Sequence, residues 1–337
     1  MKPFISVLMS IYNESICDIK KSIESILCQS ETNFEFIIVN DNTDRTDYMD
    51  LLTEYEQKDE RILIVQNEEN IGLAASMNKA LTIAQGNFVA RMDADDISMP
   101  SRLEIEADLL NKKKCDVVFS DYTRIGSNDE LLDNGEKKLN LCSEHNLIEQ
   151  IIFNGVVHHP TVMMRKEAIN NVNGYRLFPC AQDQDLWVRM LESGARFVYT
   201  EEVLLLYRVR ETSISQNRGF QQYLTIQYIL ELMKERADNS GVDSFTKETY
   251  QKYIDNKCRD SQEIKRFYIA KNNLIAAKKA RNEGVMLRCF RKRLSAFMQS
   301  KTLRHSYLFK LKNKNKLVSY IERRQRICWR NEIDAIT

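Results

Sequence analysis

The chain has 337 residues, of which 43% are hydrophobic and 29% are charged, and it contains only 10 Gly and 4 Pro. These values are typical of a globular protein and exclude a collagen-like or largely disordered chain. No apolar run approaches the roughly 18–20 residues that a membrane-spanning helix needs. The eight cysteines are scattered without a C-x-x-C pair, which favours reduced thiols over a disulfide framework or a zinc site.

The net charge of +1 conceals a strong division of charge along the chain. Residues 265–330 hold 20 Lys and Arg and only two acids, a net of +18, so the rest of the chain carries −17. Such a basic segment indicates an anionic surface or polymer as its partner. The alternative is a solvated helical bundle whose charge pairs with the acidic part.

Short apolar runs and helical stretches alternate over the first 120 residues. Apolar residues recur at helical spacing in 16–28, whereas 34–39 is a near-continuous apolar run of the kind found in buried parallel strands. The pattern predicts strands at 4–9, 34–39, 62–66, 88–92 and 117–120, separated by helices at 16–28, 48–60, 72–85 and 100–112. This alternation predicts a doubly wound α/β sheet.

Beyond residue 160 the pattern changes from mixed to helical. It predicts strands at 161–164, 196–200 and 203–209, a short helix at 186–192, and longer helices at 220–236, 246–281, 287–298 and 317–327. We therefore expect two parts, an α/β domain over residues 1–215 and a basic C-terminal helical region over residues 216–337.

Polar residues collect where the predicted parallel strands end, and ligands of open α/β sheets bind at that edge. The sharpest feature is the run of Asp93, Asp95 and Asp96. Three carboxylates within four residues favour a hard cation such as Mn2+ or Mg2+, shared with substrate phosphates. Taken alone, the run is equally consistent with an acidic turn before the next helix.

Two other polar groups follow later in the chain. Asp183 and Asp185 precede a short helix, where a carboxylate could cap the helix or act as a general base. His158 and His159 precede a strand, but no third metal ligand stands at a fitting spacing. Glycine-rich dinucleotide and P-loop patterns do not occur, so a phosphate-bearing ligand would be held through a metal on carboxylates.

Together these motifs resemble those of the family 2 glycosyltransferases, whose GT-A fold is a doubly wound mixed sheet. The resemblance covers roughly residues 3–215. The matching motifs are S-I-Y-N at 10–13, V-N-D at 39–41, N-I-G-L-A-x-x-x-N at 70–78, R-M-D-A-D-D at 91–96, H-P-T at 159–161, G-Y-R at 174–176, Q-D-Q-D-L-W at 182–187 and Y-R-x-R-x-x-S-I-S at 207–215. Each motif is weak alone, but eight in family order are specific.

The resemblance implies a role for each matching position. The nucleotide-sugar would be bound by Tyr12, Asn13, Glu14, Asp41, Asn70, Arg91, Asp93, Ala94, Asp95 and Arg210. Asp41 would accept the uracil N–H, Asp93 would contact the ribose or the metal, and Asp95 and Asp96 would hold Mn2+ or Mg2+ with the diphosphate. Asp183 would be the catalytic base. The acceptor side would be formed by Asp185, Trp187 and His159.

Four positions depart from the family pattern. Ser10 replaces the usual Pro, the segment after Asp41 is one residue shorter, and Gln182 replaces the Glu that commonly precedes the base. Arg210 stands where the family often has a metal-binding His. Arg cannot ligate a cation, but it can pair with a diphosphate as a fixed charge.

The resemblance implies an inverting enzyme that moves a hexose from a UDP-sugar to a sugar hydroxyl and forms a β-glycosidic bond. Glucose or galactose is favoured, N-acetylglucosamine is compatible, and the implied acceptor is a polyprenyl-diphosphate-linked glycan of O-antigen or capsule synthesis. The missing His at position 210 and the altered Glu at position 182 motivate one alternative, a UDP-binding protein that has lost catalysis. A nucleotidyltransferase is disfavoured because no glycine-rich, basic loop stands near the first strand.

The basic region contains an amphipathic stretch. Its apolar residues at helical spacing are Leu287, Phe290, Leu294, Phe297 and Met298, and Arg288, Arg291, Lys292 and Arg293 stand between them. A basic amphipathic helix is typical of attachment to a membrane surface. Because no recognised nucleic-acid module accompanies the charge, we expect no nucleic-acid partner and a peripheral position on the cytoplasmic face of the membrane, against anionic lipid.

Overall fold

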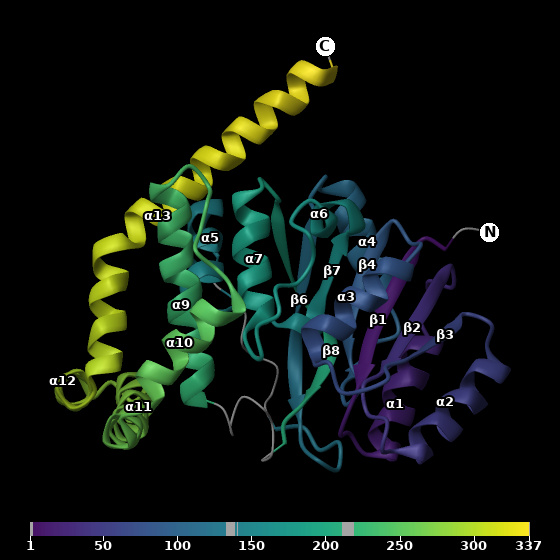
Figure 1. Ribbon diagram of the computed structural model, residues 1–337, viewed down its shortest axis with the longest axis horizontal. Helices are drawn as coiled ribbons and strands as arrows, with labels where there is room; N and C mark the ends of the chain where they lie inside the picture. The colour runs from purple at the N-terminus through teal and green to yellow at the C-terminus, as the bar shows by residue number, and fades with distance from the viewer. Residues whose placement is uncertain (1–2, 133–138, 140, 211–218, 337) are drawn as a thin grey trace. The chain divides into compact units, whose positions relative to one another are not determined.

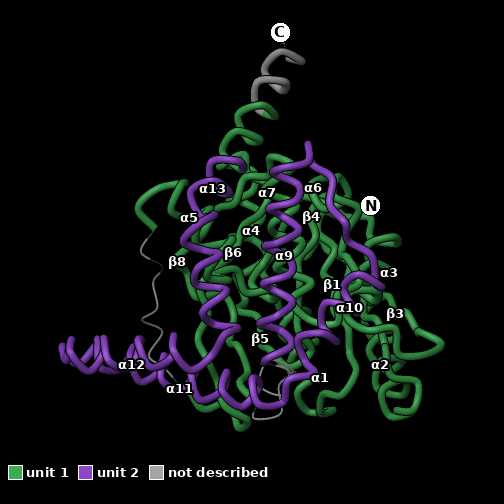
Figure 2. The backbone as a smooth tube through the Cα atoms, turned by 60° about the vertical axis from the view of Figure 1, so that its left-hand side comes forward, with its two compact units in different colours: residues 1–213, 321–337 green, residues 214–320 purple. Residues whose placement is uncertain are grey.

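The computed structural model describes residues 3–132, 139, 141–210 and 219–336 (Figure 1). The chain divides into two compact units, residues 1–213 with 321–337, and residues 214–320 (Figure 2). The predicted boundary at residues 215 and 216 lies outside the described residues. The division also differs from the predicted one at the C-terminal end, because residues 321–337 group with the first unit.

An eight-stranded mixed sheet forms the centre of the first unit, in the order β3-β2-β1-β4-β7-β6-β8-β5. Its strands are β1 (Ile5–Ile11), β2 (Phe34–Asn40), β3 (Ile62–Gln66), β4 (Phe88–Asp93), β5 (Ile97–Ser98), β6 (Val117–Ile125), β7 (Val162–Arg165) and β8 (Phe197–Arg208). Strands β1 to β4 are parallel, and β7 runs antiparallel to both β4 and β6. The predicted mixed α/β class is confirmed.

Helices of this unit pack their apolar stripes on the sheet. They are α1 (Ile16–Leu27), α2 (Thr46–Lys58), α3 (Leu73–Ile83), α4 (Arg102–Lys112), α5 (Glu144–Asn154), α6 (Lys166–Asn170) and α7 (Gln182–Glu192), with a 3-10 turn at His159–Thr161. In α1, for example, Ile19, Ile23 and Ile26 are fully buried in one core with the strand residues Val7 and Phe36. The apolar residues of α1, which recur every three or four positions in the sequence, thus form one buried face of the helix.

The register of the parallel strands brings their carboxyl ends level. Ser10 of β1 lies beside Asp93 of β4, and Ile11 lies beside Asn40 of β2. The chain leaves β1 towards β2 on one side, while β4 pairs with the other side of β1. This is the switch point of an open α/β sheet, where ligands bind.

The second unit is helical. It contains α9 (Gly219–Asp238), α10 (Lys247–Cys258), α11 (Ser261–Asn282), α12 (Met286–Gln299) and the first part of α13 (Lys301–Ile336). The rings of Phe220 and Phe267 meet edge to face, 4.9 Å apart, in its core. Helices α11 and α12 form a hairpin (Figure 2) whose buried contact consists of the small residues Ala277, Ala280 and Cys289.

Four predicted elements, two strands and two helices, differ from the observed ones. Strands predicted at 196–200 and 203–209 are a single strand, β8, with two register shifts against β6. The helix predicted at 246–281 is broken, because Asp260 caps a new helix by accepting from the Glu263 N–H at 3.0 Å. The helix predicted at 317–327 begins at Lys301 instead, where the Ser300 hydroxyl accepts from the Leu303 N–H.

Candidate active site

The loop after β1 is folded back on its own acidic residue. Tyr12 and Asn13 are exposed, and Glu14 Oε2 accepts from their backbone N–H groups at 2.7 and 3.0 Å. From the loop after β2, Asn42 Nδ2 donates to the Tyr12 carbonyl at 2.6 Å. Two exposed side chains therefore stand at the switch point on a backbone that its neighbours hold in place.

Asp41, at the end of β2, is 2% exposed and already carries three hydrogen bonds. Its Oδ1 accepts from Asn67 Nδ2 at 2.8 Å and from the Ile71 N–H at 2.9 Å, and its Oδ2 accepts from the Gly72 N–H at 2.9 Å. Gly72 has φ 83°, a conformation that glycine adopts without strain. Asn70, which is exposed, accepts from the same N–H. These contacts make Asp41 the anchor of the loop that opens α3, and its contact with uracil stays a prediction.

Two of the three aspartates after β4 are bound to their own chain. Asp93 forms an ion pair with the buried Arg91. Asp96 is 1% exposed, and its Oδ1 accepts from the Arg208 N–H at 2.8 Å. Its Oδ2 has no hydrogen-bond partner among the described residues, and burial raises its pKa well above 3.8. Ala94, between them, is buried in the turn.

Asp95 is, with Asp93, one of the two partly exposed carboxylates of this run. One quarter of its side chain is exposed, and its Oδ2 lies 3.0 Å from Nε of Arg210. Burial of the carboxyl and the charge of Asp93 raise the pKa of Asp95 to about 7, although Arg210 opposes the shift. The ionised form of Asp95 is therefore unfavourable here unless a cation lies beside it.

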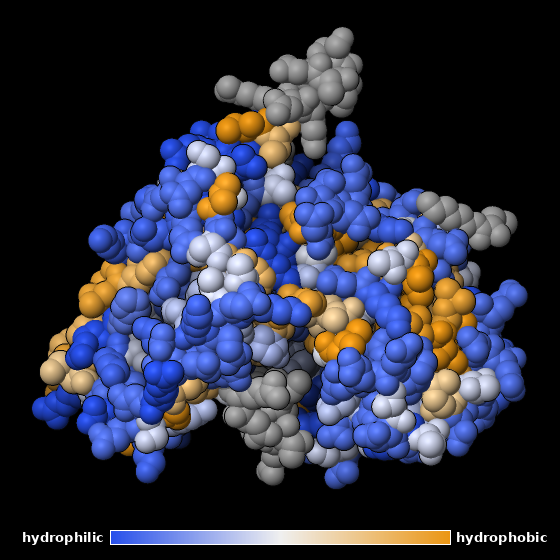
Figure 3. Space-filling model, in the orientation of Figure 1, coloured by the Kyte–Doolittle hydropathy of each residue, from blue (hydrophilic) through white to orange (hydrophobic). Residues whose placement is uncertain are grey.

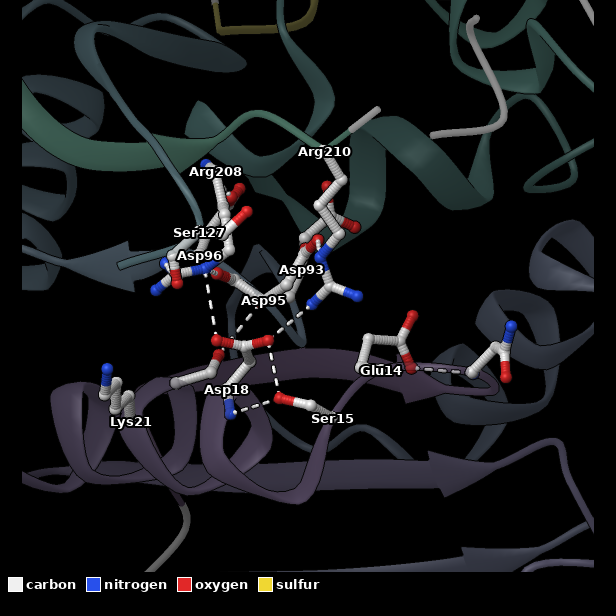
Figure 4. A network of polar contacts seen from close by, with 12 residues as sticks. Glu14, Ser15, Asp18, Lys21, Asp93, Asp95, Asp96, Ser127, Arg208 and Arg210 are labelled. Atoms are coloured by element: carbon white, nitrogen blue, oxygen red, sulfur yellow. Dashed lines mark hydrogen bonds and ion pairs between the residues drawn. The ribbon is translucent and has the colours of Figure 1, made fainter. Parts of the chain in front are cut away.

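Asp18 of α1 and Arg208 of β8 complete this network, and sequence reasoning assigned neither of them to the site (Figure 4). Arg208 is 1% exposed; its Nε lies 3.3 Å from Asp18 Oδ1, and its Nη2 lies 2.6 Å from Asp129 Oδ1. Nη2 of Arg210 lies 2.9 Å from Asp18 Oδ2. Ser15, with Asp18 three residues later, is a helix-start pattern that could have drawn attention to this carboxylate.

The carboxylates do not assemble into a protein-only metal site. Across the residues that the structure describes, no three His, Cys, Asp or Glu side chains lie where they could hold one ion together. The predicted ligands Asp93, Asp95 and Asp96 do not surround one position here: Asp93 pairs with Arg91, Asp95 pairs with Arg210, and Asp96 is enclosed. Asp93 and Asp95, which are partly exposed, fit a Mn2+ or Mg2+ ion that is shared with a ligand, since such ions are commonly held by one or two carboxylates and by substrate phosphates.

Asp183 approaches the same edge from α7. The residue before this helix, Ala181, has a left-handed φ of 56°, and its own side chain does not cap the helix. Burial raises the pKa of Asp183, the N–H groups of Gln184 and Asp183 itself oppose the shift, and the charges of Asp93 and Arg91 act on it too. Asp183 and Asp93 therefore belong to one electrostatic site.

The three residues predicted for the acceptor lie in the interior, which corrects that assignment. Asp185 is fully buried and pairs with Nε of Arg189 at 2.7 Å. Trp187 is 1% exposed, and its ring lies edge to face with that of His159. His159 Nε2 lies 2.8 Å from the hydroxyl of Tyr175, and burial lowers its pKa well below 6.5. These side chains support α7 and do not face an acceptor.

Comparison with known proteins agrees with this geometry. The chain matches the family described as "Glycosyl transferase family 2" over residues 6–172. Enzymes of this family generally use divalent metal ions. The "O-antigen biosynthesis glycosyltransferase WbnJ" of Escherichia coli is 33% identical over 239 residues, which are 69% of this chain and 90% of that protein.

A second Escherichia coli protein is named "UDP-Glc:alpha-D-GlcNAc-diphosphoundecaprenol beta-1,3-glucosyltransferase WfgD". It is 25% identical over 222 residues, which are 64% of this chain and 80% of that protein. Among solved structures, S. aureus TarS 1–349 in complex with UDP-GlcNAc matches with a TM-score of 0.57 and 15% identity, over 88% of this chain and 92% of that chain. This structural likeness confirms the predicted GT-A-type fold.

Proposed function

This chain belongs to the family 2 glycosyltransferases, and we propose that it is an inverting hexosyltransferase of surface-polysaccharide synthesis. Its donor is a UDP-hexose, with glucose or galactose favoured and N-acetylglucosamine as the alternative. Its acceptor is a sugar hydroxyl on a polyprenyl-diphosphate-linked glycan, and the product bond is β. The printed names of WbnJ and WfgD support the pathway and acceptor class, and the UDP-GlcNAc complex of TarS supports the donor class.

One observation carries the proposal: a partly exposed carboxylate, Asp183, stands within electrostatic range of Asp93 at the switch point. The polar loop of Tyr12, Asn13 and Glu14 lies on the same level of the sheet. A nucleotide held at the strand ends would thus direct its sugar towards the N-terminus of α7. In this proposal the base and the leaving group stand on opposite sides of one reacting carbon, as inversion requires.

Asp183 acts as the general base in this proposal. It takes the proton of the acceptor hydroxyl as that oxygen bonds to the anomeric carbon, and the bond between this carbon and the UDP oxygen breaks. Attack opposite the departing UDP converts an α-linked donor into a β-linked product. Burial raises the pKa of Asp183, which makes the carboxylate a stronger base than an exposed aspartate.

Asp95 would hold a Mn2+ or Mg2+ ion together with the donor phosphates. When bound, such an ion offsets the negative charge that gathers on UDP as it leaves. Asp93 would support this arrangement through Arg91, and Asp96 would do so by fixing the turn. The roles of Tyr12, Asn13, Asn70 and Ala94 in the nucleotide pocket remain part of the same proposal.

Release of UDP from a panel of UDP-hexoses, assayed with polyprenyl-diphosphate-linked acceptors and Mn2+, tests the reaction. We expect Asp183→Asn to lower transfer by about 100- to 10,000-fold, the usual contribution of a general base, with UDP affinity unchanged. Asp185→Asn is not the matched control, because it breaks a buried ion pair; Asp108→Asn on the exposed face of α4 is suitable. Full transfer by the Asp183→Asn variant would refute the base assignment. A wild type that binds UDP but transfers no sugar would establish the inactive alternative. Release of pyrophosphate instead of UDP by the wild type would establish a nucleotidyltransferase.

The second unit exposes the apolar face of α12. Met286, Leu287, Phe290, Leu294 and Met298 are each at least 50% exposed. On the side of α12 turned towards α11, the small residue Cys289 is buried against Ala277 and Ala280. Figure 3 shows apolar side chains gathered at the left-hand edge, over α12 and the start of α13. A bundle helix normally buries such residues, so this face is available to a partner.

Charge complementarity identifies the partner that we propose, an anionic membrane surface. Arg288, Arg291 and Arg293 are exposed between the apolar residues of α12. Each basic residue near an anionic leaflet contributes about 1 kcal/mol, and the apolar side chains add shallow insertion. Among the described helices, none combines the length and apolar character that crossing a membrane requires. The proposed location is therefore peripheral, on the cytoplasmic face where a lipid-linked acceptor is displayed.

Sedimentation of the full chain with vesicles of neutral or anionic lipid tests this surface. We expect binding to anionic vesicles that weakens with salt, and a loss of about 100-fold when Arg288, Arg291 and Arg293 are changed to Gln. The control is the same charge removal at Lys112, Lys113 and Lys114, which are exposed in the first unit. Equal binding to neutral vesicles, or an equal loss in the control, would restore the alternative of a solvated helical bundle.

A further inference from the structure

Arg210 holds a fixed place at the rim of the switch point. Its guanidinium lies between a carboxylate of α1 and a partly exposed carboxylate of the turn after β4: Nη2 is 2.9 Å from Asp18 Oδ2, and Nε is 3.0 Å from Asp95 Oδ2 (Figure 4). About one quarter of the Arg210 side chain is exposed. The positive charge is therefore anchored on two sides and still open to a ligand.

The anchor of Arg210 is itself rigid. The Asp18 N–H donates to Ser15 Oγ at 3.1 Å, and Ser15 Oγ donates to Asp18 Oδ2 at 2.6 Å, which fixes the carboxylate in the first turn of α1. The buried Arg208 holds the other oxygen of Asp18 at 3.3 Å. A side chain fixed in this way loses little conformational freedom when a ligand binds.

Arg210 also forms an ion pair with Asp95, the carboxylate that a divalent ion would need as its ligand. Asp95 is the aspartate to which the proposed function assigns an ion shared with phosphates, and its Oδ2 is already paired with Arg210 Nε. The two ion pairs use Nε and Nη2, and among the described residues Nη1 makes no ion pair or hydrogen bond. The N–H donors of a guanidinium match the spacing of phosphate oxygens.

From these contacts we propose that Arg210 is a built-in cation for the donor diphosphate, so that the chain binds UDP without a divalent metal ion. This inference rests on the proposed function, because it names the residue that receives the phosphates of the same donor. A divalent ion, when present, adds to this charge at Asp95 but is not required for UDP to bind. Arg210 thus contributes to affinity for the diphosphate and not to affinity for the nucleoside.

Calorimetric titration of the full chain with UDP, in EDTA and in Mn2+, tests the inference. We expect the wild-type affinities in the two conditions to agree within about tenfold, and Arg210→Ala to weaken UDP binding in EDTA by about 10- to 100-fold, as for the loss of a hydrogen bond to a charged group. Uridine, which lacks phosphates, should bind the wild type and this variant equally. Arg210→His should make UDP binding depend on Mn2+.

The matched control is Arg61→Ala, because Arg61 also pairs with a neighbouring aspartate but lies at the start of β3, at the opposite edge of the sheet. Melting temperatures identify any variant that does not fold, and Arg210→Lys provides a second, milder change that should give an intermediate loss. A wild type that binds UDP only with Mn2+, or an Arg210→Ala variant with unchanged affinity in EDTA, would overturn the inference alone. No binding of uridine or UDP under either condition would overturn the proposed function with it.

Discussion

Removing the buried guanidinium of Arg208 should destabilise the first unit strongly. Arg208 joins four segments: it pairs with Asp18 of α1 and with Asp129, its Nε donates to the Asp95 carbonyl at 2.8 Å, and its Nη1 donates to the Gly126 carbonyl at 2.9 Å. Its side chain is 1% exposed. The substitution Arg208→Met keeps much of the volume and the apolar stem but removes every donor.

The magnitude follows from what the substitution leaves behind. Breaking a buried ion pair by removing one partner costs about 3–5 kcal/mol, because the other charge remains without compensation. Here the side chains of Asp18 and Asp129 are 14% and 35% exposed, and Asp129 retains its pair with Lys21. Partial hydration and these other partners place the expected loss near the lower limit, at about 3 kcal/mol.

Urea unfolding, followed by circular dichroism, measures this loss of the free energy of unfolding. Lys112→Met is the control, because the side chain of Lys112 is 72% exposed and its pair with Asp108 lies on the surface; we expect a change within about 0.5 kcal/mol. In a double-mutant cycle, Asp18→Asn and Arg208→Met should cost less together than the sum of the two single changes. A loss below about 1 kcal/mol, or strict additivity, would refute the reasoning that Arg208 is held by charge.

Two other predictions concern groups whose role the structure changes or reveals. Trp187→Ala should lower the free energy of unfolding by about 3–5 kcal/mol, whereas Trp187→Phe should leave the KM for the acceptor unchanged; a raised KM would return Trp187 to the acceptor side. Burial raises the pKa of Glu106, which pairs with Arg102 inside α4, from 4.5 to about 7. Since the folded chain holds this proton more tightly than the unfolded chain, the contribution of Glu106 to stability is full below pH 4.5 and is lost as the pH rises through 7. Over that interval wild type should lose roughly 3 kcal/mol relative to Glu106→Gln in urea unfolding, and parallel pH profiles would contradict the assignment.

The sheet and its polar edge follow from local sequence signals. The strand Phe34–Asn40, which contains a near-continuous apolar run, is buried along its whole length. Polar residues directly after such a run must lie at the end of the strand. The breaks in β8 and in the helix predicted at 246–281 depend on pairing with β6 and on the cap at Asp260. The pairing of β8 with β6 is a tertiary effect and cannot be read from local sequence. The cap at Asp260 is a local signal, but apolar residues at helical spacing continue across it and favoured one unbroken helix.

The network around Arg208 and Arg210 could not be predicted, because its members are far apart in sequence. Asp18 and Arg210 are separated by 192 positions. Helix periodicity places Asp18 on the polar side of α1, but only the position of β8 beside that helix gives its carboxylate two arginines. The motif around residues 207–215 contained both cations and gave no indication of which acids they would meet.

The errors on the acceptor side have a common physical cause. In an α-helix, residues two positions apart point about 200° away from each other, so Asp183 and Asp185 of one motif cannot both face the same ligand. Asp185 binds Arg189, which donates to the carbonyls of Val172 and Gly174. That segment continues into Tyr175, which exchanges two hydrogen bonds with Asn78 of α3 and holds His159 through its hydroxyl.

The start of α3 is in turn fixed by Asp41. Contacts therefore run from the end of β2 through α3 and Tyr175 to α7, the helix that carries Asp183. Motif residues expected to contact substrate instead determine where the carboxylate lies relative to the strand ends. Because a displacement of about 1 Å can lower a rate by 100-fold, a residue such as Asp185 can be essential for transfer without contacting either sugar.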